Sequence, residues 1–221
     1  MFFCCPDSTQ GPIQKQGNGK NTLLAMITLF YAGLLFGCAP ATQNINMYND
    51  SGDAVMALDY RDFQQAAGEA VNSMLQSGAL NKQDGGRYVL AVSRIINDTM
   101  QRIDTDQLVK KIRVELLQSG KVVVTTAVSA DGAEDQMSMQ TRELRKSDEF
   151  NQQTVAKKGQ MIAPDMSLSG KIIQRNVRVS KAKQQVEYYF QLTLTDINSG
   201  LAFWEGESVI GKRGSSKSVS W

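Results

Sequence analysis

The sequence contains no histidine among its 221 residues, and its three cysteines, Cys4, Cys5 and Cys38, all lie near its start. Without an imidazole, Ser-His-Asp and Cys-His catalysis, a histidine metal site and a histidine pH switch are excluded. The residues beyond Cys38 also lack the thiolates for a zinc or iron–sulfur site and for a disulfide. We therefore expect a folded body that is stabilised by its apolar core and contains no metal and no other cofactor.

The sequence also has no large excess of positive or negative charge. The 24 Lys and Arg residues stand against 22 Asp and Glu, for a formal net charge of +2. Domains that bind nucleic acid usually carry a strongly basic face with interleaved aromatic residues. The glycines at 85, 86, 159 and 170 form neither a Walker loop nor a GxGxxG motif after a strand. We therefore expect neither a nucleic acid partner nor a small-molecule substrate.

One apolar run, over residues 22–35, is preceded by Lys15 and Lys20 and followed by Phe36-Gly37-Cys38. This order is typical of a secretory signal, and the run is shorter than the roughly 20 residues that a transmembrane helix needs. The Cys38 context resembles the lipobox of bacterial lipoproteins, in which the cysteine becomes the lipid-modified first residue. Cys38 is thus the predicted lipidation site. The alternative is an ordinary apolar residue in a signal or core helix.

Four parts of the chain follow from this interpretation. Residues 1–37 form a signal peptide, 38–58 a lipidated tether, 59–212 a globular domain and 213–221 a flexible tail. A flexible tether of this length averages only about 25 Å end to end. Because Ala39 stands where Gram-negative lipoproteins retained in the inner membrane often have an acidic residue, we expect an outer-membrane protein that faces the periplasm.

Apolar periodicity predicts the elements of the globular domain. The predicted helices cover residues 59–77, 104–119, 136–146 and 154–158, and a capping box at Asp104 and Gln107 opens the second. The predicted strands cover residues 87–96, 121–126, 166–179, 184–196 and 201–210, with Trp204 in the core. The compact strand 121–126 is expected to be buried on both faces. This order predicts an α/β (α+β) fold, a single mixed sheet covered by helices and ending in a three-stranded antiparallel meander.

Carboxylates are the one catalytic chemistry that the composition permits, because two of them suffice for glycoside cleavage. Asp131, Glu134 and Asp135 precede the third predicted helix, and Asp148 and Glu149 follow it. Clustering in the sequence sets no separation between two carboxyl groups. Solvated loop acids, some placed favourably near a helix N-terminus, are the preferred interpretation. A glycan hydrolase remains a third functional hypothesis.

Cations concentrate in the first hairpin of the predicted meander, where only Glu187 lies nearby. One interpretation is a solvated hairpin whose lysines discourage pairing between sheet edges. The other is a docking patch that attracts an acidic protein surface. The candidate partner-binding residues are Arg175, Arg178, Lys181 and Lys183.

Three segments, 93–120 with its Asn97-Asp98-Thr99 motif, 159–173 and 192–206, match a known family in order. They resemble the LpoB family of penicillin-binding protein activators. Its fold is related to the N-terminal domain of TolB and, more distantly, to the curli secretion lipoprotein CsgG. Together the three segments cover most of the chain from Asp59 to Lys212, and the resemblance rests on their combination.

The resemblance implies an outer-membrane lipoprotein that binds a class A penicillin-binding protein and stimulates its peptidoglycan synthesis by contact, without enzymatic activity of its own. One departure is the tether, which has only Pro40 where family members carry longer, Pro-rich tethers. The alternative is an envelope assembly or secretion lipoprotein like CsgG. That function would require oligomerisation and a membrane-inserting hairpin.

Overall fold

A computed structural model describes residues 45–47, 49, 52 and 54–218. The predicted signal peptide, Cys38 and most of the predicted tether lie outside these residues. The chain divides into two units, 1–45 and 46–221, and every helix and strand of the described residues belongs to the second. None of the helices in the described part is long and apolar enough to cross a membrane.

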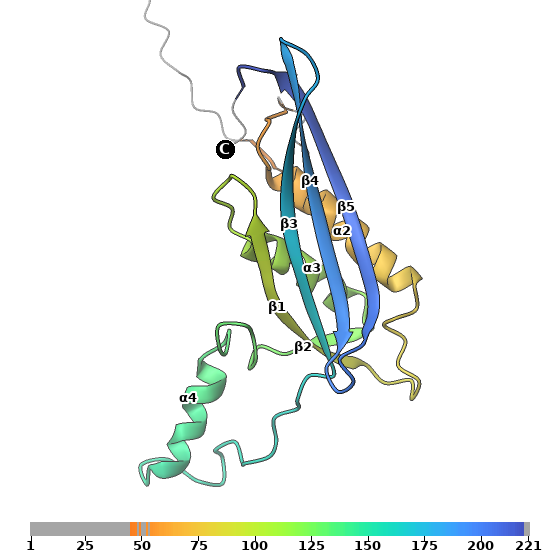
Figure 1. Cartoon of the computed structure of the whole chain (residues 1–221). Helices are drawn as coiled ribbons and strands as arrows, with labels where there is room; N and C mark the ends of the chain where they lie inside the picture. The colour runs from red at the N-terminus through yellow and green to blue at the C-terminus, as the bar shows by residue number, and fades with distance from the viewer. Residues whose placement is uncertain (1–44, 48, 50–51, 53, 219–221) are drawn as a thin grey trace, which may run out of the picture. The chain divides into compact units, whose positions relative to one another are not determined.

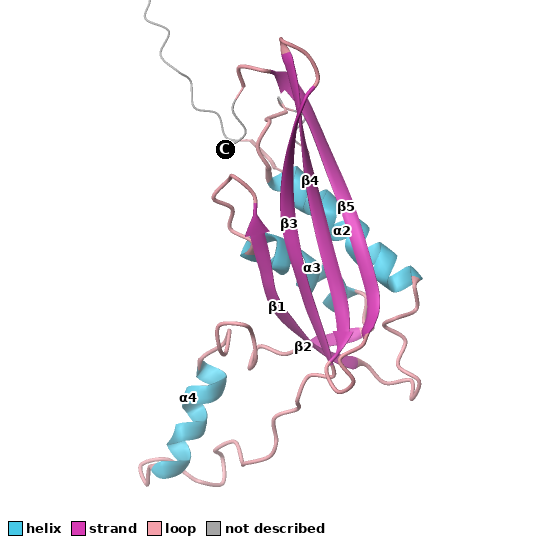
Figure 2. Ribbon diagram, in the orientation of Figure 1, coloured by secondary structure: helices cyan, strands magenta, loops and turns pink. Residues whose placement is uncertain are grey.

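The described elements alternate between helices and strands before the sheet closes with a meander (Figure 2). The helices are α2 (Tyr60–Gln76), α3 (Asp106–Gln118) and α4 (Met137–Glu143), which continues into the 3-10 helix η2 (Leu144–Lys146). The strands are β1 (Tyr88–Asp98), β2 (Val122–Val124), β3 (Met166–Arg178), β4 (Lys183–Asp196) and β5 (Ala202–Ser215).

The five strands form one mixed sheet in the order β2-β1-β3-β4-β5. Strand β1 runs parallel to both of its neighbours, whereas β3, β4 and β5 are antiparallel. The predicted α+β class, the mixed sheet and the final meander are therefore confirmed.

Helix α2 begins at a capping box and packs one apolar face on the sheet. The Asp59 carboxylate accepts from the N–H groups of Arg61 and Asp62, and the Asp62 carboxylate accepts from the Asp59 N–H. Phe63 on its buried face meets the ring of Phe190 edge to face, with centroids 6.0 Å apart. Gly78 ends the helix with a φ of +77°, which favours glycine. The prediction of an amphipathic helix here is confirmed.

Helix α3 buries Leu108, Ile112 and Leu116 on one face, as its spacing predicts. The capping box predicted at Asp104 and Gln107 is wrong. The N-cap is Thr105, which makes no side-chain cap bond, and the Asp104 carboxylate accepts from the Asp106 N–H instead, at 3.0 Å. The short-range turn that this bond forms leaves Asp104 one residue too early for the box.

Helices α2 and α3 cover one face of the sheet and leave the other open (Figure 1). Along β4 the buried side chains alternate with partly or fully exposed ones, as expected for a sheet with one buried face. Trp204 lies on the buried face, as predicted, where its indole N–H donates to Ser73 at 3.2 Å. A Cβ at Gly206 would lie 2.2 Å from the Trp204 ring, so this site requires glycine. Helix α4 and η2 contain no buried residue.

Three predicted elements differ from the structure. Residues 154–158 form no helix, because the Asn151 carbonyl accepts from the Thr154 N–H and closes a turn. The strand predicted over 121–126 is only β2, at the sheet edge, and Val122 is its one buried residue. Strand β5 extends beyond Ile210 to Ser215, which pairs with Lys183. Residues 213–215 thus belong to the sheet, although a charge, a glycine and a serine in succession are typical of a tail.

Candidate functional site

The open face of the sheet carries side chains in a regular arrangement. The antiparallel register places the side chains of β3, β4 and β5 in transverse rows. One row consists of Ile173, Tyr189 and Val209, which lie side by side across the three strands. Val209 is 47% exposed, and the other two are partly exposed. We name these three residues the apolar row.

Polar pairs lie on one side of the apolar row. The Lys171 ammonium contacts the Asp98 carboxylate of β1 at 2.7 Å, and the Gln191 amide donates to Glu207 at 2.8 Å. The first contact joins β3 to β1 and the second joins β4 to β5. These contacts hold the side chains in place on this face.

A hydrogen-bonded network lies on the other side of the apolar row. The Tyr189 hydroxyl and the Gln185 amide both donate to the Glu187 carboxylate, at 2.7 Å each. The Tyr189 hydrogen bond, the Gln185 amide and the charge of Arg175 hold the pKa of Glu187 below its usual value. The same hydrogen bond raises the pKa of Tyr189. Arg213 on β5 donates to Gln185 at 2.6 Å and closes the network.

The hairpin between β3 and β4 forms one tip of the sheet. Its turn is closed by the N–H groups of Val179 and Ser180, which donate to the Lys183 carbonyl at 3.1 and 3.0 Å. The end of β5 is bound to the same turn, since the Ser216 N–H donates to the Ala182 carbonyl at 3.0 Å. The exposed cations of this region are Arg178, Lys181, Lys183, Arg213 and Lys217. We name these five residues the basic tip.

The structure separates the four cations that the sequence groups together. Arg175 faces the open side of the sheet, opposite Glu187 and in electrostatic contact with it. Arg178, Lys181 and Lys183 belong to the basic tip. The sequence prediction missed Arg213 and Lys217, because it assigned them to a tail, and it missed the apolar row. A signal was present for Tyr189, an aromatic residue on the polar side of an alternating strand.

The segment that leads into α2 is bound to the sheet at the same end as the basic tip. The buried Tyr188 hydroxyl donates to the Met56 carbonyl at 2.9 Å and accepts from the Gln101 amide. Burial raises the pKa of Tyr188 to about 12. Lys212 donates to the Ala57 carbonyl at 2.8 Å.

Lys212 also forms an almost buried ion pair with Asp62, at 2.5 Å. Burial opposes the charged form of the neighbouring Asp59, but the Arg61 hydrogen bond and the Lys212 charge outweigh this effect and lower its pKa. The start of α2, the incoming chain and β5 are therefore held together by one group of polar contacts.

The Asn97-Asp98-Thr99 motif shapes the loop that positions Gln101. The Asn97 side chain accepts from the Thr99 N–H at 3.1 Å and donates to the Gln101 carbonyl at 2.8 Å. The Gln101 side chain in turn accepts from the Leu58 N–H at 3.1 Å. Asn97 and Thr99 thus have a structural role in the fold, whereas Asp98 contributes to the open face.

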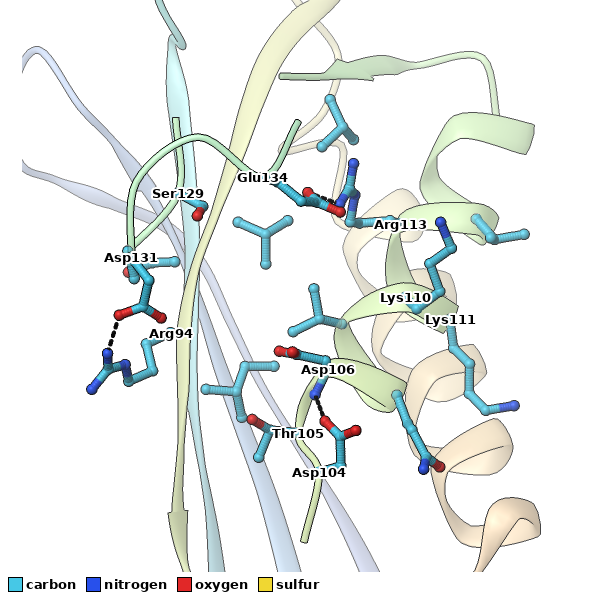
Figure 3. Close-up of a pocket in the computed structure, with 18 of the residues that line it drawn as sticks. Arg94, Asp104, Thr105, Asp106, Lys110, Lys111, Arg113, Ser129, Asp131 and Glu134 are labelled. Atoms are coloured by element: carbon cyan, nitrogen blue, oxygen red, sulfur yellow. Dashed lines mark hydrogen bonds and ion pairs between the residues drawn. The ribbon is translucent and has the colours of Figure 1, made fainter. Parts of the chain in front are cut away.

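A cleft of about 1150 Å³ lies between β1, α3 and the loop 125–134 (Figure 3). Val92, Ile95 and Val109 contribute apolar lining. Figure 3 shows Asp131 bound to Arg94 of β1 and Glu134 bound to Arg113 of α3. Asp131 and Glu134 are thus each neutralised by a guanidinium, and Asp104, Asp106 and Glu115 also line the cleft.

The comparison with protein families matches residues 62–210, more than half of the chain, to the peptidoglycan-synthase activator LpoB. The chain belongs to the LpoB family. LpoB-family proteins are activators of a peptidoglycan synthase and not enzymes, so the expectation of a non-enzymatic protein is confirmed. No curated protein matches the sequence.

Several solved structures are similar to the chain at low sequence identity. The LpoB C-terminal domain from Salmonella enterica is 16% identical, with a TM-score of 0.40 over 67% of this chain and 98% of that one. The E. coli LpoB structure determined by NMR is 15% identical, with a TM-score of 0.38 over 94% and 89% of the chains. Lipoprotein GNA1162 from Neisseria meningitidis is 11% identical, with a TM-score of 0.31 over 60% and 87%.

The hydrolase hypothesis loses its support in this LpoB-family chain. Asp131 and Glu134 are bound by arginines, and the Asp135 carboxylate accepts from the Met137 N–H at the start of α4, at 3.1 Å. Asp148 and Glu149 are exposed after η2. These acids have structural partners or face solvent, in agreement with the preferred interpretation.

Proposed function

We propose that this protein is an outer-membrane lipoprotein, anchored through Cys38 and facing the periplasm, that binds and activates a class A penicillin-binding protein. The match to the LpoB family over residues 62–210 is the observation that carries this proposal. The family accounts for the peptidoglycan synthase as partner, and the signal and lipobox pattern before Ala39 supports the anchor. Activation proceeds by contact, because the protein supplies no chemistry of its own.

The open face of the sheet is the surface that contacts the synthase. Its apolar row is ringed by polar pairs, which is the arrangement of an interface core with a polar rim. Tyr189 at the centre is the anchor, because tyrosine is enriched among residues that dominate binding energy. Arg175 beside it is the predicted partner-binding residue that this face retains. An acidic patch on the synthase is the complementary surface.

The test measures glycan polymerisation from lipid II by the class A synthase of the same host, with and without the protein. We expect stimulation and co-purification of the two proteins. The absence of both would overturn the assignment of this partner, although the fold would stand.

A second pair of variants tests the surface. Val209→Asp places a charge in the apolar row and removes the stimulation, whereas Thr195→Asp introduces the same charge on the same face near the far end of β4 and preserves it. Both substitutions lie on the open face, so the core stays intact. Equal stimulation by the two variants would show that the partner contacts another surface.

A further inference from the structure

The basic tip concentrates positive charge that nothing in the described residues neutralises. None of the ion pairs among those residues includes Arg178, Lys181, Lys183, Arg213 or Lys217. Two carboxylates that contact β4 and β5 have partners of their own, since Glu187 of β4 accepts from Tyr189 and Asp62 of α2 is bound to Lys212 of β5. The tip is therefore available to an external anion.

Two distant segments build this tip. Arg178, Lys181 and Lys183 come from the β3–β4 hairpin, whereas Arg213 and Lys217 come from the end of β5. The contact between the Ser216 hydroxyl and the Lys181 carbonyl, at 3.0 Å, holds the two segments together. The charge density is thus a product of the fold, since neither segment alone contains all five cations.

The chain that leads back to Cys38 leaves the folded body beside the same tip. Met56 packs on Gly214, where a Cβ would lie 2.7 Å from the Met56 sulfur, and Gly214 pairs with Gln184, next to Lys183. In Figure 1 the segment before α2 runs along this end of the sheet. Cys38 and Met56 are 18 residues apart, so the chain between them can reach at most about 65 Å. An anchor at Cys38 would therefore hold the basic tip within reach of the membrane.

We propose that the basic tip docks on anionic phospholipid headgroups of the membrane that holds the anchor. Phosphodiester groups accept hydrogen bonds from guanidinium and ammonium groups, and each such cation adds to the attraction of an anionic surface. The proposal rests on the lipidation of Cys38 in the proposed function, but the lipid-binding surface itself does not depend on the acyl chains. Docking by the tip leaves the apolar row of the open face free for the synthase.

The mature chain with Cys38→Ser, which carries no acyl group, provides the test. It is mixed with vesicles of phosphatidylethanolamine and phosphatidylglycerol, or with vesicles of phosphatidylcholine alone, and the bound fraction is measured by flotation. We expect binding to the anionic vesicles that weakens with salt, and little binding to phosphatidylcholine. The absence of binding to phosphatidylglycerol vesicles at low salt would overturn the proposal.

A matched pair of double variants tests the location. Lys181→Glu with Lys183→Glu reverses two charges of the basic tip and weakens vesicle binding at least about tenfold. Lys157→Glu with Lys158→Glu makes the same change at two exposed lysines of the loop before β3 and leaves binding within about twofold of the parent. An equal loss in both would mean that net charge, and not the tip, drives binding, which contradicts the proposal.

Stimulation of the synthase in detergent solution distinguishes the two candidate ligands of the basic tip, which are anionic phospholipid and an acidic patch on the synthase. We expect the Lys181→Glu, Lys183→Glu protein to stimulate as well as the parent there. Loss of stimulation without a bilayer would assign the tip to the synthase and overturn the lipid proposal. If the parent itself fails to stimulate, the proposed function fails, while the vesicle result still decides the role of the tip.

Discussion

Two neighbouring isoleucines and two neighbouring tyrosines divide between the faces of the sheet. Ile172 and Tyr188 are fully buried under the helices, whereas Ile173 and Tyr189 lie partly exposed on the open face. Side chains alternate along a strand, so a step of one residue exchanges the core for the surface. The comparison shows how one strand serves two purposes. The same residue type stabilises the fold at one position and is available to a partner at the next.

The largest effect on stability is expected at the buried isoleucine. Ile172→Ala removes a fully buried side chain and leaves a cavity, which costs about 3 kcal/mol in the free energy of unfolding. Ile173→Ala is the matched control and costs less than about 1 kcal/mol. Urea unfolding of both variants makes the measurement. Equal losses would show that the open face is not separate from the core.

Two ion pairs that involve strand residues, Lys212–Asp62 and Lys171–Asp98, differ in the same way. Lys212→Met leaves Asp62 nearly buried without its partner and lowers the free energy of unfolding by about 2 kcal/mol. Lys171→Met removes the exposed pair with Asp98 and costs less than about 1 kcal/mol. Thermal or urea unfolding compares the two. A larger loss for Lys171→Met would reverse the assignment of structural and surface charges.

Much of this division was accessible from the sequence, because the alternation in β4 distinguishes its two faces before any contact is known. The pairing of β1 with β3 could not be predicted, since these strands are separated by α3, β2, α4 and η2 along the chain. No sequence pattern predicted that Met56 and Gln101 are hydrogen-bonded to Tyr188, because hydrogen bonds between distant segments leave no periodic signal. The sequence identified the cations of the β3–β4 hairpin that belong to the basic tip. It placed Arg213 after the last strand, although this residue belongs to β5.

A smaller effect is expected at the buried tyrosine. Tyr188→Phe leaves the Met56 carbonyl and the Gln101 amide without their partner and costs about 1 to 2 kcal/mol in the free energy of unfolding. Tyr189→Phe affects an exposed hydroxyl and changes stability by less than about 0.5 kcal/mol. The two variants are compared by urea unfolding at neutral pH. A greater cost for Tyr189→Phe would contradict the described burial.

The same residue also makes the stability depend on pH. The pKa of Tyr188 is raised to about 12, so the folded state holds this proton more tightly than the unfolded state, whose pKa is about 10. The resulting stability is complete below pH 10 and is lost as pH rises towards 12. Tyr188→Phe is expected to reduce this part of the alkaline loss in unfolding measurements. An unchanged pH profile in the variant would exclude Tyr188 as its source.

The most direct test of the central claim, that the open face contacts the synthase, is the affinity of the purified class A synthase for the Tyr188→Phe and Tyr189→Ala proteins. The account predicts that Tyr189→Ala, with unchanged unfolding, binds about 30-fold more weakly, as expected when a central anchor is lost. Tyr188→Phe, although less stable, retains the parent affinity. The account would be contradicted if the Tyr189→Ala protein bound with the affinity of the parent while the Tyr188→Phe protein bound more weakly.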